Sequence, residues 1–152
     1  MILDSAYRQV GRVRAANGRH ADLHELLLTP EGTVLLTCYP DSVPSDLSAV
    51  GGPRRRQVLQ SVIQEIDVRT GRLLFEWRSL EHVPVTESYF PGWGVYDYLH
   101  VNSIDITPDG HLLVSARNTW ALYRLHRRTG RVLWRPGASP SAAGSRPRFH
   151  WP

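Results

Sequence analysis

The stretch Thr29-Pro-Glu-Gly-Thr-Val-Leu-Leu-Thr37 decides the fold, because it recurs as Thr107-Pro-Asp-Gly-His-Leu-Leu-Val-Ser115. Each copy places a turn of proline, an acidic residue and glycine directly before a short apolar run. Proline and glycine supply the backbone angles that tight turns need, and a short apolar run beside such a turn is typical of a strand. The repeat therefore predicts two copies of one antiparallel unit.

A second pair of matching stretches lies further along each copy. Ile66-Asp-Val-Arg-Thr-Gly-Arg-Leu-Leu-Phe75 recurs as Leu125-His-Arg-Arg-Thr-Gly-Arg-Val-Leu-Trp134, and each has a Thr-Gly hairpin turn near its centre. Each copy thus predicts two hairpins, one closed by each kind of turn. Four antiparallel strands per repeat, with repeats about 40–60 residues apart, is the pattern of a propeller blade.

The two copies differ in length, and the difference locates a loop. The first pair is offset by 78 residues, from Thr29 to Thr107, and the second by 59, from Ile66 to Leu125. The first copy therefore holds 19 additional residues, which fall on residues 39–57. This segment is rich in Pro, Ser, Gly and Arg, so it predicts a long loop insertion.

These patterns predict an all-β protein made of β-propeller-type blades. We expect a partial propeller over residues 1–137, with four-stranded blades around 20–78 and 98–136, and an irregular tail over 138–152. Propellers usually close with four to eight blades, whereas this sequence supplies about two to three. The chain is therefore expected to be a fragment or to need partner chains.

Composition narrows the class of protein further. A hydrophobic fraction of 41% suffices for a core, and the net charge of +4 is modest. The one dense basic cluster, at residues 54–56, lies in a Gly/Pro-rich stretch without a nucleic-acid-binding motif, so no nucleic-acid partner is expected. The sequence contains no run of about 18 apolar residues, so it predicts no membrane-spanning helix. The N-terminal residues lack the apolar core of a signal peptide, and localisation stays open.

Two histidines and one arginine are the candidate catalytic residues. His24 and His100 each stand just before a strand that leads into a Pro-acid-Gly turn, and Arg117 follows the next strand after His100. The innermost strand of each propeller blade lines the central channel, so both histidines are placed to face one axial site. Arginine offers paired N–H donors that match sulfate or phosphate oxygens, and histidine serves as base, acid or nucleophile. Each residue alone also fits a purely structural role.

Two alternatives for this site follow from the same residues. His24 and His100 suit a metal ion, but no carboxylate or thiol completes a clear ligand set, so no metal and no cofactor are predicted. The aromatic run from Tyr89 to Tyr98 precedes His100. It either walls a pocket for an aryl group or packs the start of the blade, and the sequence leaves both open.

Four stretches of this chain carry a resemblance to a known family. They are Ala21-Asp-Leu-His-Glu25, Gln64-Glu-Ile-Asp67 with Thr70-Gly71 and Phe75-Glu-Trp77, Asp97-Tyr-Leu-His-Val-Asn-Ser-Ile-Asp105, and Ser115-Ala-Arg-Asn118. Together they resemble the arylsulfotransferase family, in the branch common in actinobacteria and fungi. The third and fourth are the specific ones, and the resemblance runs from about residue 3 to residue 137.

The resemblance implies a six-bladed propeller with an axial active site. Family enzymes move a sulfuryl group from a phenolic sulfate ester to another phenol through a sulfohistidine, without the nucleotide sulfate donor. The implied partners are an aryl sulfate ester and a phenolic acceptor. Carried over by motif, His24, His100 and Arg117 bind the sulfuryl oxygens and assist the leaving phenolate. Asn102 and Tyr98 are then expected to bind substrate.

One departure from the family pattern concerns the nucleophile. The family places the nucleophilic histidine in a Gln-His-Asp motif downstream of the Trp-x-x-Gly that is here Trp134-Arg-Pro-Gly137, and this sequence contains no such motif. His150 lies roughly where the motif would begin, with different neighbours. Family enzymes are usually exported, yet no export signal is visible here. The isolated chain is therefore expected to have little or no transferase activity.

Two other functions fit part of the pattern. A non-catalytic propeller-like module would use the same residues to hold an anion. A quinoprotein-like propeller would need a dense set of repeated tryptophan motifs, and only Trp77 and Trp134 occupy equivalent blade ends.

Overall fold

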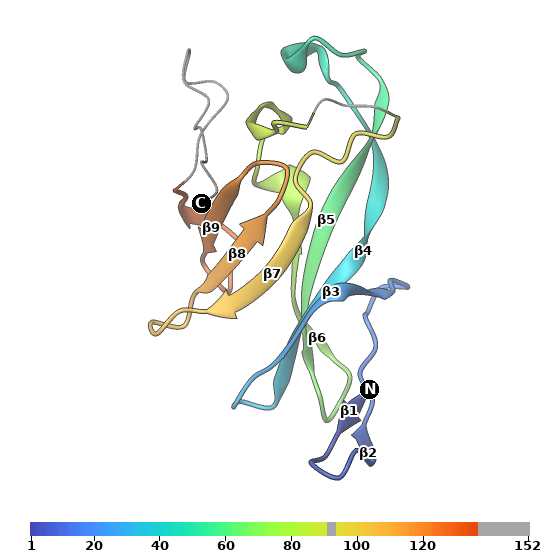
Figure 1. The fold of residues 1–152 in the computed structure, drawn as a ribbon, viewed down its shortest axis with the longest axis vertical. Coiled ribbons are helices and arrows are strands. Elements are labelled where there is room, and N and C mark those ends of the chain that lie inside the picture. Colours follow the sequence, from blue (N-terminus) through green and yellow to red (C-terminus); the bar gives the residue numbers. More distant parts are fainter. Residues whose placement is uncertain (91–93, 137–152) are drawn as a thin grey trace, which may run out of the picture.

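The computed structural model describes residues 1–90 and 94–136 and shows an all-β protein with three antiparallel sheets (Figure 1). Two of the sheets have four strands each, which confirms the predicted fold class and is compatible with propeller-type blades. The first has the order β3-β4-β5-β6, from Ala21–Leu28, Thr33–Ser45, Arg56–Asp67 and Leu73–Arg78. The second has the order β10-β9-β8-β7, from Val132–Trp134, Ala121–Leu125, Leu112–Ala116 and Val101–Ile106.

Smaller elements complete the described chain. A two-stranded ribbon near the N-terminus pairs β1 (Ile2–Leu3) with β2 (Gln9–Gly11). Short 3₁₀ helices cover Ser48–Val50, Ser79–Glu81 and Val85–Glu87. None of the helices within the described ranges is long and apolar enough to cross a membrane. The predicted tail over 138–152 lies outside the described residues.

The repeated turns close equivalent hairpins in the two large sheets. In the first sheet the Thr29 amide donates to the Thr33 carbonyl, and in the second the Thr107 amide donates to the His111 carbonyl, both at 2.9 Å. Gly32 and Gly110 have φ angles of 77° and 79°, which glycine adopts without steric cost. The glycine of each repeated turn is thus a requirement of its backbone conformation.

The long loop predicted over residues 39–57 is shorter in the structure, because β4 runs on to Ser45 and β5 begins at Arg56, which leaves residues 46–55 outside the two strands. Strand β4 continues to Ser45 and pairs with β5 through Ser45↔Arg56, after a register shift between Cys38 and Asp41. Strand β3 ends its pairing at Ala21↔Cys38, so this part of β4 is a sheet edge. An edge strand tolerates prolines such as Pro44, because their missing N–H costs no ladder hydrogen bond. Proline content therefore misled the sequence-based prediction.

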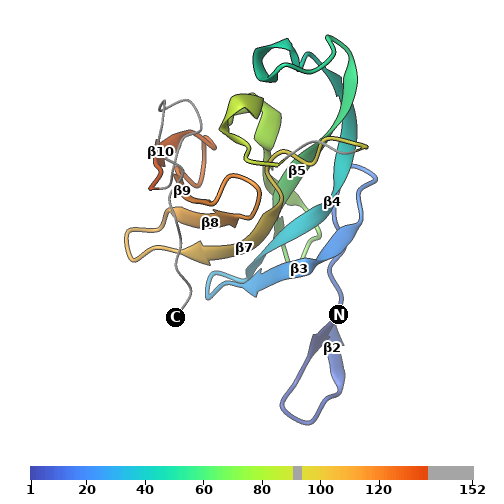
Figure 2. The same ribbon diagram turned by 45° about the horizontal axis from the view of Figure 1, so that its top comes forward.

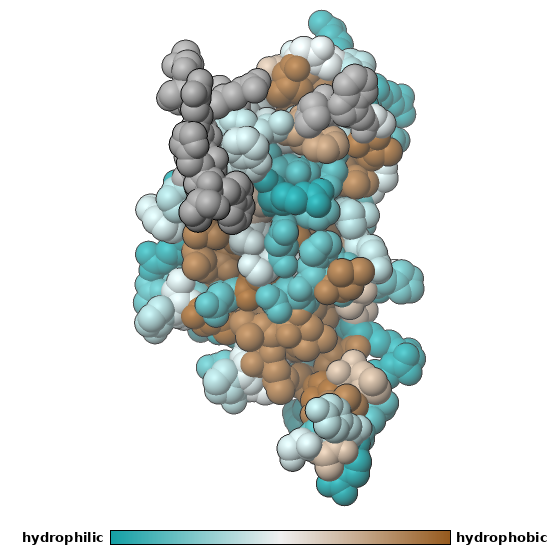
Figure 3. Space-filling view, in the orientation of Figure 1, coloured by the Kyte–Doolittle hydropathy of each residue, from teal (hydrophilic) through white to brown (hydrophobic). Residues whose placement is uncertain are grey.

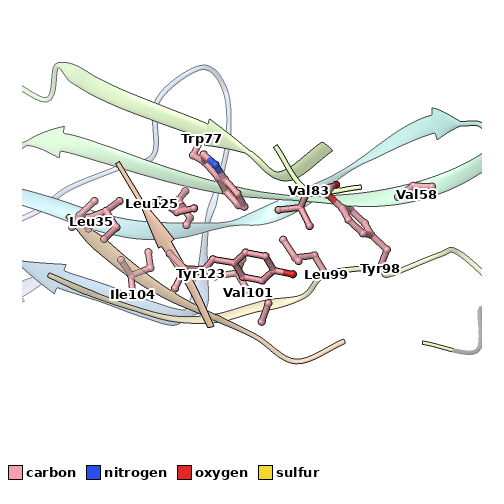
Figure 4. Close-up of a cluster of buried hydrophobic side chains, with 14 of the residues drawn as sticks. Leu35, Val58, Trp77, Val83, Tyr98, Leu99, Val101, Ile104, Tyr123 and Leu125 are labelled. Carbon is pink, nitrogen blue, oxygen red and sulfur yellow. Dashed lines mark hydrogen bonds between the residues drawn. The ribbon is translucent and has the colours of Figure 1, made fainter. Parts of the chain in front are cut away.

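The main core lies between the two four-stranded sheets (Figure 4). Leu35, Ile63 and Trp77 of the first sheet pack in one buried cluster with residues of the second such as Val114 and Tyr123, all fully buried. Trp77 Nε1 also donates to the Gly130 carbonyl at 3.1 Å, which ties β6 to the β9–β10 turn. Burial and this hydrogen bond hold the two sheets against each other.

A polar network fastens the N-terminal segment to the first sheet. The Glu76 carboxylate accepts hydrogen bonds from Gln64 at 2.6 Å, Arg78 at 2.8 Å, Asn17 at 3.1 Å and Arg19 at 3.3 Å. Burial alone would raise the pKa of Glu76, but these hydrogen bonds outweigh it and lower the pKa to about 2. The folded state therefore favours the charged carboxylate.

Replacing Glu76 with glutamine should reduce the fall in the free energy of unfolding that occurs as the pH is lowered. Because the folded pKa is depressed from 4.5 to about 2, the contribution of Glu76 is complete above pH 4.5 and is lost as pH falls toward 2. It amounts to roughly 2–3 kcal/mol. Urea unfolding of both proteins from pH 6 to pH 2.5 measures it. Glu81→Gln, which changes an exposed carboxylate, is the control. If Glu76→Gln and the parent chain lost the same free energy of unfolding between pH 6 and pH 2.5, this account would be refuted.

Strand β3 is the edge of the first sheet and carries exposed leucines. Leu26 and Leu28 are 45% and 50% exposed, and apolar surface is visible over this strand in Figure 3. Exposed apolar side chains on an edge strand are a surface that proteins usually cover or protect. This edge lies beside β7, the first strand of the second large sheet (Figure 2).

Candidate functional site

The structure brings the two candidate histidines together. His24 lies on β3 and His100 directly precedes β7, and these first strands of the two large sheets lie side by side (Figures 1 and 2). The ring centroids are 5.1 Å apart and the ring planes are at 89°. The sequence-based expectation that both face one place agrees with this geometry.

Backbone hydrogen bonds hold His100 beside Arg117. The Arg117 amide donates to the His100 carbonyl at 2.9 Å, and the Asn118 amide donates to the Leu99 carbonyl at 3.0 Å. The Asn118 side-chain amide donates to the Asp97 carbonyl. His100 has a φ of 57°, a left-handed conformation that costs a non-glycine residue energy and that the surrounding hydrogen bonds must impose. Residues 97–100 and 117–118 thus form one fixed unit.

A carboxylate and a guanidinium both face the same nitrogen of His100. Its Nδ1 lies 2.5 Å from Asp97 Oδ2 and 3.3 Å from an Arg117 terminal nitrogen, and that nitrogen is 3.8 Å from Asp97 Oδ2. Arginine can only donate, whereas the nearer carboxylate only accepts when ionised. We therefore assign the proton to Nδ1, where it is donated to Asp97. This leaves Nε2 as the reactive nitrogen of His100.

His24 has a carboxylate of its own. Asp22 Oδ1 lies 3.5 Å from His24 Nδ1, and it accepts hydrogen bonds from the His24 amide at 2.8 Å and from Thr37 Oγ1 at 2.5 Å. The Asp22 side chain is 9% exposed, so it is held almost out of solvent. Each histidine thus has one aspartate beside it, and the Asp97 carboxylate is the one within hydrogen-bonding distance of its imidazole.

Sequence reasoning missed Asp22 and Asp97 as functional residues. Both lie within the quoted motifs, two residues before His24 and three before His100. The repeated placement of an aspartate just before each histidine is the signal that would have found them. A carboxylate that fixes the tautomer of a histidine is a common supporting arrangement.

A hollow of about 190 Å³ adjoins the two histidines. Its lining includes His24, His100 and both aspartates, together with Tyr39 and Cys38. Burial raises the pKa of the Cys38 thiol to about 12, so the thiol stays protonated and unreactive at neutral pH. The Cys38 thiol is therefore not a candidate nucleophile in this hollow.

A second hollow of about 490 Å³ adjoins Arg117, whose guanidinium contacts His100. It is lined by Asn102, Ser115, Arg117, Trp120 and Leu122, among others. Asn102 Oδ1 is buried and accepts no hydrogen bond from any of the described residues. Asn102 and Arg117 thus line the same hollow, while the Asn102 oxygen itself is covered by protein.

Tyr98 occupies a different environment from the one expected. It is fully buried in the core between the sheets, where Figure 4 shows it near Val83. Its hydroxyl donates to the Val83 carbonyl at 3.1 Å. The structure therefore gives Tyr98 a packing role in place of the substrate contact predicted for it, because the chain turns its side chain inward just before His100.

Charges in the site nearly balance. With both imidazoles neutral, Arg117 and the two aspartates leave one net negative charge, and with both imidazoles protonated the net charge becomes positive. The described residues include no group of three or more His, Cys, Asp or Glu side chains placed to hold a metal ion. Arg117, whose side chain is 57% exposed, is the permanently charged donor available to an anion.

The fold and this cluster define a class of protein: an all-β chain with blade-like sheets and a candidate anion site where the first strands of two blades meet. The model of the arylsulfotransferase (ASST) family matches residues 1–144, and the chain belongs to that family. Comparison with curated proteins gives no match for this chain.

Proposed function

We propose that the chain binds the sulfuryl group of an aryl sulfate ester at His24, His100 and Arg117. In this proposal the site belongs to an enzyme that moves the group from a phenolic sulfate ester to a phenol. The observation that supports it most directly is the contact of the two imidazoles at 5.1 Å, with Arg117 against His100. Family membership supports the same substrates.

Each residue has a chemical role in this proposal. Arg117 donates to the sulfuryl oxygens, which carry the negative charge of the ester, while the electron pair of the breaking ester S–O bond passes to the phenolic oxygen. His100, held through Nδ1 by Asp97, presents Nε2 to the phenolic oxygen. There the imidazolium gives a proton to the leaving phenolate, and the neutral imidazole accepts one from the incoming phenol. His24 binds the sulfuryl group from the opposite strand.

The proposal extends to the setting of these residues. We place the chain in the branch common in actinobacteria and fungi, and we propose that its two large sheets work as two blades of a larger, six-bladed propeller. The exposed leucines of β3 support a larger assembly, because a neighbouring blade or chain would cover them. The nucleophile would then come from another blade of that propeller, as a Gln-His-Asp motif is absent from this sequence.

Binding of phenyl sulfate tests the site without requiring turnover. Replacing Arg117 with methionine should weaken binding by about 10- to 100-fold, because charge-assisted hydrogen bonds contribute about 1.5–3 kcal/mol. Calorimetric titration of the 152-residue chain measures the affinity. Arg131→Met removes an exposed arginine elsewhere and should leave the affinity unchanged. Equal affinities for Arg117→Met and the parent chain would refute the proposed anion site.

Transfer of the group is a separate expectation. The 152-residue chain should transfer no sulfuryl group from phenyl sulfate to a phenol above the level of a His100→Ala variant, because it lacks the nucleophile motif. Product formation by chromatography measures the rate. Transfer clearly above that control would show that a histidine of this chain is the nucleophile. Binding without transfer is also what the alternative, a non-catalytic anion-binding module, would show.

Detection of a covalent intermediate distinguishes a sulfotransferase from a non-catalytic anion-binding module. An enzyme supplied with the remaining blades of a family member should form a sulfohistidine that mass spectrometry detects, whereas a binding module should hold phenyl sulfate unchanged.

A further inference from the structure

We propose that Trp120, supported by Tyr89, is a specificity-determining residue that stacks on the aryl ring of the sulfate ester. This inference rests on the proposed function, since it names what selects an aryl over an alkyl sulfate at the same site. The two rings are stacked, with centroids 4.7 Å apart and planes within 12° of parallel. Trp120 is nevertheless 48% exposed, so part of the indole is open to a ligand.

The backbone fixes Trp120 relative to Arg117. Residues 117–120 form the turn between β8 and β9, and the Trp120 amide donates to the Arg117 carbonyl at 3.2 Å. Trp120 has a φ of 50°, which is unusual for a bulky residue and marks a conformation imposed by its surroundings. The same turn therefore presents the sulfate-binding guanidinium at one end and the indole at the other.

Tyr89 is fixed to the same turn from the opposite direction. Its amide donates to the Asn118 carbonyl at 2.7 Å. Tyr89 comes from the aromatic run before His100, for which the sequence alone allows two interpretations. Its stacking on Trp120 restricts the indole, and a restricted ring loses less conformational entropy when it binds a ligand.

The hollow beside this pair matches a phenolic ligand in size and chemistry. Its volume of about 490 Å³ lies within the range of small-molecule sites, and Trp120, Arg117 and Asn102 line it together. A phenyl sulfate placed there would meet the guanidinium with its sulfate and the indole with its ring.

A comparison of two sulfate esters that differ only in their ring distinguishes recognition of the ring from recognition of the sulfate. We would measure the affinities of phenyl sulfate and cyclohexyl sulfate, two esters of similar size and equal charge, by calorimetry on the full chain. Stacking is favourable by about 0.5–1.5 kcal/mol beyond burial, so phenyl sulfate should bind about two- to tenfold more tightly. Trp120→Asn removes the ring with a residue that tolerates the left-handed backbone, and the preference should fall to about one.

Three further variants make the result decisive. Trp120→Phe should keep most of the preference, and Trp134→Ala, which removes a tryptophan that is 51% exposed, should keep all of it. Arg117→Met should weaken both esters equally and leave their ratio unchanged. A preference that survives in Trp120→Asn would overturn this inference while the anion site stands. Failure of both esters to bind the parent chain would overturn both proposals.

Discussion

Replacing Trp77 with alanine is expected to lower the free energy of unfolding by about 3–5 kcal/mol, the usual cost of removing a large buried aromatic side chain. Trp77 is fully buried between the two large sheets. Its indole stacks on the His82 ring at 5.7 Å and donates to the Gly130 carbonyl. The substitution would leave a cavity and an unpaired carbonyl at the same position, and the two losses add.

Urea unfolding followed by circular dichroism measures this change. Trp134 ends β10 in the second copy of the repeat and is 51% exposed, so Trp134→Ala should change stability by less than about 0.5 kcal/mol. Trp77→Phe should fall between them, because it keeps a ring but not the hydrogen bond to Gly130. If the two alanine variants were equally stable, Trp77 would not be the residue that holds the sheets together.

The fold was predictable where the sequence repeats itself. The two turns of each copy specify backbone angles and strand ends locally, so residues such as Gly32 and Gly110 identify them without knowledge of the partner strands. The extension of β4 past Tyr39 was not predictable in this way. Its strand character comes from pairing with residues such as Val58, which lie more than ten positions away, and its prolines indicate a loop in any local window.

The candidate site shows the same division. His24 and His100 were predictable candidates because they hold matching places before the repeated turns, and Arg117 because it follows the next strand; the structure brings the three together. Tyr98 was predicted to contact substrate but lies in the core, because the sequence does not show whether the side chain of an aromatic residue before a strand points into a pocket or into the core. The partnership of Trp120 with Tyr89 was hidden for a related reason, since 31 positions separate the two residues and only the folded chain stacks them.

A partly buried ion pair joins the two large sheets at their turn ends. Arg127, in the β9–β10 turn, donates to both carboxylate oxygens of Glu65 on β5, at 2.6 Å and 3.1 Å. Thr33 Oγ1 donates to the same carboxylate at 2.6 Å. Burial would raise the pKa of Glu65, but the hydrogen bonds from Arg127 and Thr33 outweigh it and lower the pKa below 4.5. Removing the arginine would reverse that balance.

Arg127→Met should therefore destabilise the protein by about 3–5 kcal/mol, because it leaves the Glu65 carboxylate, 8% exposed, without its cation. The neighbouring Arg128 is exposed, and Arg128→Met should cost less than about 0.5 kcal/mol in the same urea unfolding experiment. The double variant Glu65→Leu with Arg127→Met should recover most of the loss, since a buried pair replaced by apolar side chains leaves no unpaired charge. If the double variant were as unstable as Arg127→Met alone, lost packing and not the stranded charge would explain the effect.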